Sequence, residues 1–237
     1  MRHKRAISVI CALFFIVGIF ISPIGSSEAS AKTKTLSLVN ANNQVDFAAL
    51  QEYNPDIYAW IYIPNTQVNY PIVQNAKDDY YLMKNVDGSK GYPGAIYTNK
   101  INTKTFADFN TVIYGHNMKN KSAFGSLHSF DNADFFNQNQ DMYIYTPEGV
   151  YTYQIYSTVK YSNALILSAF PSYTDAGKQS FINMSLTGYA KSSVEHVRAG
   201  VQVTGDDKLV TLSTCINDSR YRFLVIAKQT GFAAYNY

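Results

Sequence analysis

Cys215 is the strongest candidate for chemistry in this sequence. It closes the run LVTLSTC, in which a strand period of two places Thr211, Ser213 and Cys215 on one face, apart from the aliphatic side chains. A free cysteine is usually a small core hydrophobe. The polar face favours the alternative, a thiol that opens to solvent at a strand end and acts as a nucleophile in its thiolate form.

A cysteine nucleophile commonly works with a histidine as acid or base, and His116 is the best placed of four. It follows the apolar run TVIYG, so that a glycine and a turn place the imidazole at a strand end. His128 lies in a helical piece where it would pack or face water, His196 lies in a polar stretch typical of exposed surface, and His3 lies near the start. A purely structural histidine remains the alternative reading of any one of them.

Two arginines follow Cys215 across a predicted tight turn. An arginine that returns from a hairpin lies near the residue where the hairpin began, and its charge would favour a thiolate and stabilise an oxyanion. Arg220 and Arg222 are two residues apart, so in a strand both point to the same face and periodicity does not choose between them. Neither the histidines nor Cys215 show zinc-ligand spacing, so we expect no metal site.

Strand-forming residues dominate the segments that must position these groups. The chain has 20 Tyr and 14 Phe beside one Trp, and its 46% hydrophobic and 16% charged residues exclude a disordered chain. Short runs bounded by turn residues predict strands at 60–63, 68–73, 94–98, 111–115, 142–146, 150–160, 208–214 and 222–229. Helices are predicted at 47–53, capped by Asp46, at 78–84, in pieces over 122–136, and at 174–192. We expect a closed or nearly closed β-barrel with functional loops in its long connections, such as 163–194.

The N-terminus is typical of an export signal. A basic start, MRHKR, precedes a 13-residue apolar run from Val9 to Ile21 and a small-residue cleavage pattern at Ala29–Ala31. A membrane span needs roughly 20 apolar residues, so a cleaved signal and a retained anchor both fit. The predicted organisation is a signal or membrane-anchor segment at 1–24, a flexible tether at 25–44 and a folded domain at 45–237.

Charge excludes nucleic acid as a partner. Three of the 20 basic residues and one of the 17 acidic residues precede residue 32, so the folded part is close to neutral. The basic end of the first segment would stay inside the cell, which places the domain on the extracytoplasmic side.

Together these motifs resemble those of the sortases, exported transpeptidases of Gram-positive bacteria. TLSTC ending at Cys215, Arg222 followed by FLVIAK, and YGHN around His116 correspond to the cysteine, arginine and histidine motifs of that family. The class B branch is indicated by NPDIYAW at 54–60, YPIVQ at 70–74, GAIY at 94–97 and the stretch from AFG to FF at 123–136. The resemblance covers about residues 45–230. It implies a mainly β fold, a closed eight-stranded sortase-type barrel with an N-terminal helical subdomain and a helix in the long loop between strands six and seven.

The resemblance also implies a mechanism for the catalytic domain at 45–237. Cys215 would attack the threonine carbonyl of an NPxT-like sorting signal and form a thioester. His116 would protonate the leaving amine and later deprotonate the incoming one. Arg222 would hold the oxyanion, because it alone directly precedes the apolar run and Ala-Lys of the family pattern, whereas Arg220 lies further into the turn.

Partners and substrate contacts follow from the same resemblance. Ser213, Thr214 and Leu82 would bind substrate, with Leu82 as an apolar wall. The donor would be a surface protein with a C-terminal sorting signal, the acceptor an amine of a peptidoglycan cross-bridge or of a pilin, and no cofactor is implied. The enzyme would be held on the extracytoplasmic face of the membrane by residues 1–24 rather than cleaved and secreted.

Two other functions fit the residues. A cysteine peptidase would hydrolyse the same thioester with water. A non-enzymatic, tyrosine-rich surface-binding barrel would leave Cys215 incidental.

Overall fold

The computed structural model describes residues 45–188 and 193–235. Its strands are β1 (Ile57–Tyr62), β2 (Asn69–Val73), β3 (Ile96–Thr98), β4 (Asn110–Tyr114), β5 (Asp141–Thr146), β6 (Gly149–Ser162), β7 (Ser193–Val197), β8 (Leu209–Cys215) and β9 (Tyr221–Ala234). Its helices are α1 (Phe47–Tyr53), α2 (Ala133–Gln138), α3 (Ile166–Ala169) and α4 (Asp175–Thr187), with the 3₁₀ segments η1 (Tyr80–Met83) and η2 (Gly125–Asp131). Strands therefore dominate, as the composition predicts.

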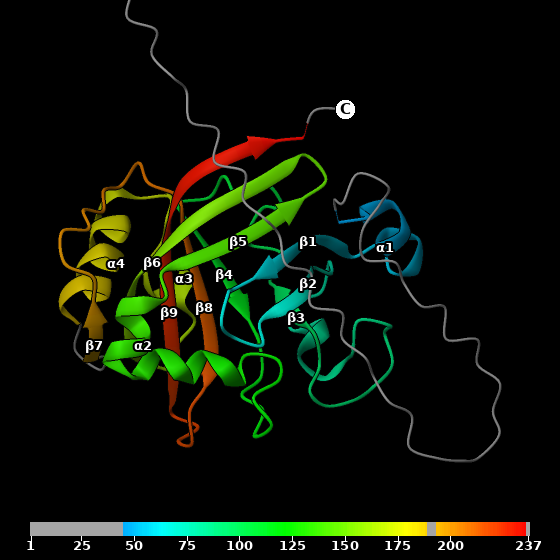
Figure 1. Cartoon of the computed structure of the whole chain (residues 1–237), viewed down its shortest axis with the longest axis horizontal. Helices are drawn as coiled ribbons and strands as arrows, with labels where there is room; N and C mark the ends of the chain where they lie inside the picture. Colours follow the sequence, from blue (N-terminus) through cyan, green and yellow to red (C-terminus); the bar gives the residue numbers. More distant parts are fainter. Residues whose placement is uncertain (1–44, 189–192, 236–237) are drawn as a thin grey trace, which may run out of the picture. The chain divides into compact units, whose positions relative to one another are not determined.

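Eight of the strands close into a barrel. The sheet order is β5-β1-β2-β3-β4-β8-β9-β6, and an additional pairing of β5 with β6 joins its ends, while β7 adds a ninth strand beside β6 (Figure 1). Two neighbouring pairs, β2 with β3 and β4 with β8, are parallel. The connection between β6 and β8, the sixth and seventh barrel strands, carries α3 and α4. The expected closed eight-stranded barrel with a helix-bearing loop is confirmed.

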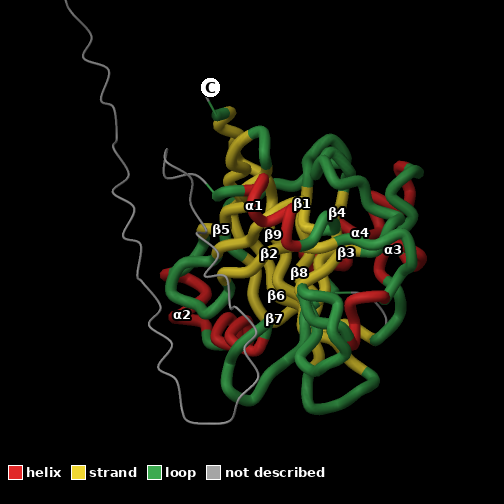
Figure 2. Tube along the Cα trace, turned by 90° about the vertical axis from the view of Figure 1, so that its right-hand side faces the viewer, coloured by secondary structure: helices red, strands yellow, loops and turns green. Residues whose placement is uncertain are grey.

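The barrel is packed on both of its faces near β8. Inside, Val210 and Leu212 join one cluster of buried side chains, and outside, Leu224 joins a second cluster with Phe181 of α4. Figure 2 shows the strands gathered at the centre, with α2 on one side and α3 and α4 on the other. Because helices cover the outer face, all of β8 except Cys215 is buried. On the polar face of β8, Cys215 is partly exposed, as expected for its thiol, whereas Thr211 and Ser213 are buried.

The helices agree with expectation in part. Asp46 caps α1, since its carboxylate accepts a hydrogen bond from the backbone N–H of Ala49 at 3.0 Å. Within the described residues, α1 is the whole of the expected N-terminal helical subdomain.

β7 was not predicted, because its short polar sequence around His196 resembles an exposed loop. In the structure its residues alternate between exposed and half-buried.

The expected membrane location requires a correction. Among residues 45–188 and 193–235, no helix is long and apolar enough to cross a membrane. The predicted anchor at 1–24 and tether at 25–44 lie outside the described residues. The predicted anchoring at the extracytoplasmic face is not supported, because the described part of the chain offers no membrane-spanning helix.

Candidate active site

One groove of about 210 Å³ brings all six predicted site residues together. Its lining comprises Asp79, Leu82, Tyr97, Tyr114, Gly115, His116, Tyr161, Asn163, Ala164, Leu165, Ile166, Ser213, Thr214, Cys215 and Arg222. The candidate nucleophile, its candidate acid or base and the candidate oxyanion donor thus share one cavity. His116 precedes Cys215 by 99 residues in the sequence, whereas Arg222 follows Cys215 by only seven.

The strand register explains why these groups meet. β4 runs parallel to β8 with Tyr114 opposite Ser213, and the backbone N–H of Gly115 donates to the Ser213 carbonyl at 3.2 Å. His116 and Cys215 therefore follow the same edge of the sheet. β9 runs antiparallel to β8, with Arg222 opposite Cys215. Backbone pairing thus places Cys215 on the strand between β4, which leads to His116, and β9, which carries Arg222.

His116 is held by a backbone carbonyl from another segment. Its Nε2 lies 2.7 Å from the carbonyl oxygen of Leu82 in η1. A carbonyl only accepts, so Nε2 is the donor, and in the neutral ring the lone pair resides on Nδ1. The ring of Tyr92, which is 57% exposed, covers the imidazole at a centroid distance of 4.6 Å. This arrangement leaves Nδ1 as the atom that can exchange a proton.

Two glycines permit the close packing around His116. A Cβ on Gly94, which has φ +72°, would lie 2.6 Å from the Leu82 carbonyl oxygen that holds the imidazole. A Cβ on Gly115 would lie 2.6 Å from Ile96 and 2.7 Å from Phe124. A larger residue at either position would push against the support of His116.

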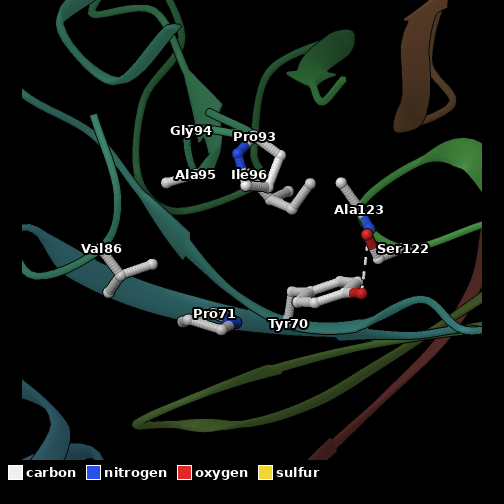
Figure 3. A pocket seen from close by; sticks show the side chains of 9 residues that line it. All are labelled: Tyr70, Pro71, Val86, Pro93, Gly94, Ala95, Ile96, Ser122 and Ala123. Carbon is white, nitrogen blue, oxygen red and sulfur yellow. Dashed lines mark hydrogen bonds between the residues drawn. The ribbon is translucent and has the colours of Figure 1, made fainter. Parts of the chain in front are cut away.

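A second, smaller hollow of about 100 Å³ lies on another side of this support. Figure 3 shows its lining, which includes Gly94 and Ile96 from one segment and Tyr70, Ser122 and Ala123 from others. The Tyr70 hydroxyl accepts a hydrogen bond from the Ala123 backbone N–H at 3.0 Å, drawn as a dashed line. This bond fixes the segment that follows His116.

The two arginines have different partners. Arg222 lines the groove and its Nη1 donates to the carbonyl oxygens of Ser219 and Tyr221 at 3.0 and 2.9 Å. Arg220 is turned to water, with its side chain 77% exposed, and pairs with Asp218 at 2.6 Å. The hydrogen bonds from Arg220 lower the pKa of Asp218 to about 2. Arg222, and not Arg220, therefore lines the groove that contains the thiol.

Stacked tyrosines line the groove near His116. The rings of Tyr97 and Tyr114 lie 5.4 Å apart, and the Tyr97 hydroxyl donates to Asp79 at 3.1 Å. Burial raises the pKa of Tyr97 far above its usual range, and the Asp79 carboxylate raises it further. Burial, followed by the charges of Asp79 and Asp78, raises the pKa of Tyr114 to about 12. Both phenols therefore stay neutral at physiological pH.

Comparison with known proteins identifies the family. A family model described as the sortase domain matches residues 61–230. The chain belongs to the sortase family. Sortase B of Listeria monocytogenes serovar 1/2a is 33% identical over 197 residues, which cover 80% of this chain and 75% of the relative.

Solved structures place the chain in class B. Sortase B from Bacillus anthracis, in a complex with AAEK2, matches this chain with a TM-score of 0.68 and 34% identity. The match covers 78% of this chain and 82% of the Bacillus anthracis chain. A Staphylococcus aureus sortase B–substrate complex has a TM-score of 0.68 and 25% identity over 78% and 84% of the two chains. This chain is a class B sortase, and hence a cysteine transpeptidase. The non-enzymatic barrel is excluded.

The predicted substrate contacts of this sortase differ in how much surface they offer. Leu82 is 41% exposed at the groove wall, whereas Ser213 and Thr214 are 4% and 1% exposed. Leu165, 58% exposed, lines the same groove from the connection between β6 and β8. The two leucines therefore offer most of the apolar side-chain surface that a peptide could meet, and Ser213 and Thr214 offer little.

Sequence reasoning missed several groove residues of the sortase. Tyr97 and Asp79 enter through the pairing of β3 with β4 and through the left-handed backbone of Asp79, with φ 57°. Leu165 could have been suspected, since it lies in the long connection predicted to carry function.

Within the described part of the chain, no group of three or more His, Cys, Asp or Glu side chains is arranged to hold a metal ion.

Proposed function

We propose that this class B sortase cleaves an NPxT-like sorting signal at the threonine carbonyl and transfers the acyl group to an amine, through a thioester on Cys215. One observation carries the proposal. The ends of β4, β8 and β9 bring the His116 imidazole, the Cys215 thiol and the Arg222 guanidinium into one groove. These are the nucleophile, acid–base group and oxyanion donor that acyl transfer requires.

The first half-reaction forms the thioester. The Cys215 thiolate adds to the threonine carbonyl, and the Arg222 guanidinium stabilises the negative oxygen of the tetrahedral intermediate. His116 enters this step as the imidazolium, protonated on both ring nitrogens, and the C–N bond breaks as it donates a proton to the leaving amine. We assign this proton to Nδ1, because Nε2 is bonded to the Leu82 carbonyl.

The second half-reaction releases the product. The amine of the acceptor adds to the thioester carbonyl while His116 takes up its proton. The C–S bond breaks, an amide forms, and Cys215 returns as a thiolate. Acid and base are thus the same residue, and no cofactor enters the sequence of steps.

Substrate recognition is assigned to the groove walls. Leu82 and Leu165, both substantially exposed, would bind the apolar parts of the signal, and Ser213 and Thr214 would contribute at the base near the sulfur. The donor would be a surface protein with a C-terminal signal. The acceptor would be an amine of a peptidoglycan cross-bridge or of a pilin. The solved structure of Staphylococcus aureus sortase B, which this chain resembles, is a substrate complex, and this supports the binding of a substrate by the present fold.

The test is a peptide-transfer assay with separated products. The protein is incubated with a small panel of NPxTx and xPxTG peptides, with and without triglycine, and adducts and acids are resolved by mass spectrometry. We expect cleavage of the NPxTx peptides after threonine and a peptide–triglycine adduct. An acid as the sole product at saturating amine would indicate a peptidase instead, and absence of any cleavage would contradict the proposal.

A further inference from the structure

The 3₁₀ segment η2 lies beside the ends of β8 and β9, where Cys215 and Arg222 emerge (Figure 1). From this segment, His128 reaches the nucleophile's own backbone. Its Nε2 lies 3.0 Å from the carbonyl oxygen of Cys215, and because a carbonyl only accepts, Nε2 is the donor. This hydrogen bond joins a histidine side chain to the main chain of the candidate nucleophile, so it can affect the position of the nucleophile.

The same imidazole also contacts the opposite strand. Its ring stacks on Phe223, with centroids 4.9 Å apart and planes at 24°. Phe223 is 3% exposed and lies opposite Thr214 in the β8–β9 ladder. It follows Arg222 directly in the sequence. One side chain therefore bridges the strand that carries the sulfur and the strand that carries the guanidinium.

His128 does not reach the groove itself. It is absent from the groove lining, which includes His116. His128 can therefore influence the reaction only through the residues it holds. In this respect it differs from His116, whose imidazole faces the groove.

The segment that presents His128 is firmly held. Leu127 and Phe130 of η2 are fully buried in the cluster that fills the barrel. Ser126 Oγ accepts a hydrogen bond from the Gln67 N–H at 3.1 Å. At the far end of η2, Nε2 of His196 donates to the Asp131 carbonyl at 2.9 Å. A group on such an anchored element can hold another residue in place.

We propose that His128 is a positioning residue for Cys215. Cys215 is the last residue of β8, so beyond it the ladder no longer constrains the chain. The bond from His128 fixes the carbonyl of this terminal residue, and hence the direction of its Cα–Cβ bond and the distance of the sulfur from Arg222. The inference rests on the proposed role of Cys215 as nucleophile.

The test compares two substitutions of His128 with a matched control. His128→Phe keeps a ring on Phe223 and removes the donor, whereas His128→Gln restores an N–H at similar reach. His196→Phe removes the same kind of bond, from an imidazole to a carbonyl, at the other end of η2, away from Cys215. Peptide-transfer kcat and KM are measured for each variant together with thermal unfolding.

We expect His128→Phe to lower kcat about tenfold, the weight of one well-placed hydrogen bond, with KM nearly unchanged. His128→Gln should recover kcat to within about threefold of wild type. His196→Phe should keep kcat even if it lowers Tm. His128→Met is a second donor-free variant, to be used in the same way if His128→Phe does not fold.

Two results would overturn the inference. Wild-type kcat in the donor-free variant would show that the bond is dispensable, and an equal loss of kcat in His196→Phe would show that η2 only needs to be folded. The wild-type enzyme in the same assay separates this question from the proposed function. No turnover by wild type would contradict the proposed function, whereas turnover that His128→Phe fully retains contradicts only the role of His128.

Discussion

The sulfur and the imidazole of this sortase are positioned by different kinds of structure. Cys215 and Arg222 face each other as partners in the β8–β9 ladder. His116 lies beyond the end of β4, and its ring is held by a carbonyl of η1 and covered by the exposed ring of Tyr92. A ladder is cooperative and resists a local change, whereas a loop contact can be altered by one substitution. We therefore expect the acid–base group to be the more easily adjusted member of the site.

The largest effect should come from removing the sulfur. Cys215→Ala should abolish peptide transfer and leave the fold intact, because Cys215 is only half-buried at a strand end and its truncation creates little cavity. Activity and thermal unfolding are measured together. A loss of several kcal/mol in unfolding free energy would show that the thiol is a core group and would contradict its role. His116→Ala should have a similarly large effect on transfer.

The second largest effect is expected at Arg222, which lies opposite Cys215 in the β8–β9 ladder. Arg222→Lys keeps the charge but loses the planar pair of donors, so we expect about a hundredfold loss in rate. The rate constant of peptide transfer at saturating substrate is the measurement. A rate within a few-fold of wild type would show that a point charge suffices at this position.

The loop contact can be tested through Gly94. Gly94→Ala forces a Cβ toward the Leu82 carbonyl that holds His116, and a displaced imidazole should lower kcat/KM about tenfold. Gly88→Ala is the matched control, since Gly88 also has positive φ, +79°, but a Cβ there would meet nothing within 4 Å. Both variants bear backbone strain, and only Gly94→Ala should lose activity. Equal activities of Gly94→Ala and Gly88→Ala would show that the position of the Leu82 carbonyl does not affect catalysis.

The smallest effect is expected at Arg220. Its side chain is exposed and paired with Asp218, and exposed pairs contribute little. Arg220→Ala should therefore reduce transfer less than about tenfold. If Arg220→Ala were more damaging than Arg222→Lys, the oxyanion role would move to Arg220.

Much of the barrel could be predicted from local patterns. The apolar runs between turn residues correctly marked the eight barrel strands, and the motifs around His116, Cys215 and Arg222 marked residues that the groove brings together. These features are local in sequence, and periodicity and turn chemistry describe them.

The supports of the site could not be predicted in the same way. The Leu82 and Cys215 carbonyls that bind His116 and His128 are main-chain groups, which every residue has, so no residue type marks them. Ser213 is buried where Ile166 of α3 lines the same groove, and the alternation within β8 does not reveal this neighbour. In the sequence, His128 resembled an ordinary packing residue, because the carbonyl that it binds is not marked by any residue type.

The parallel pairing of β4 with β8 also has a consequence for how the enzyme is made. Thr211 of β8 donates to Asn110 of β4 across 101 positions of chain at 2.9 Å, and closing such a loop is entropically costly and slow. Neither the sulfur nor the guanidinium has been synthesised when His116 leaves the ribosome. The candidate active-site residues can therefore come together only after nearly the whole chain has been synthesised, so a chain truncated before β8 and β9 cannot assemble the site.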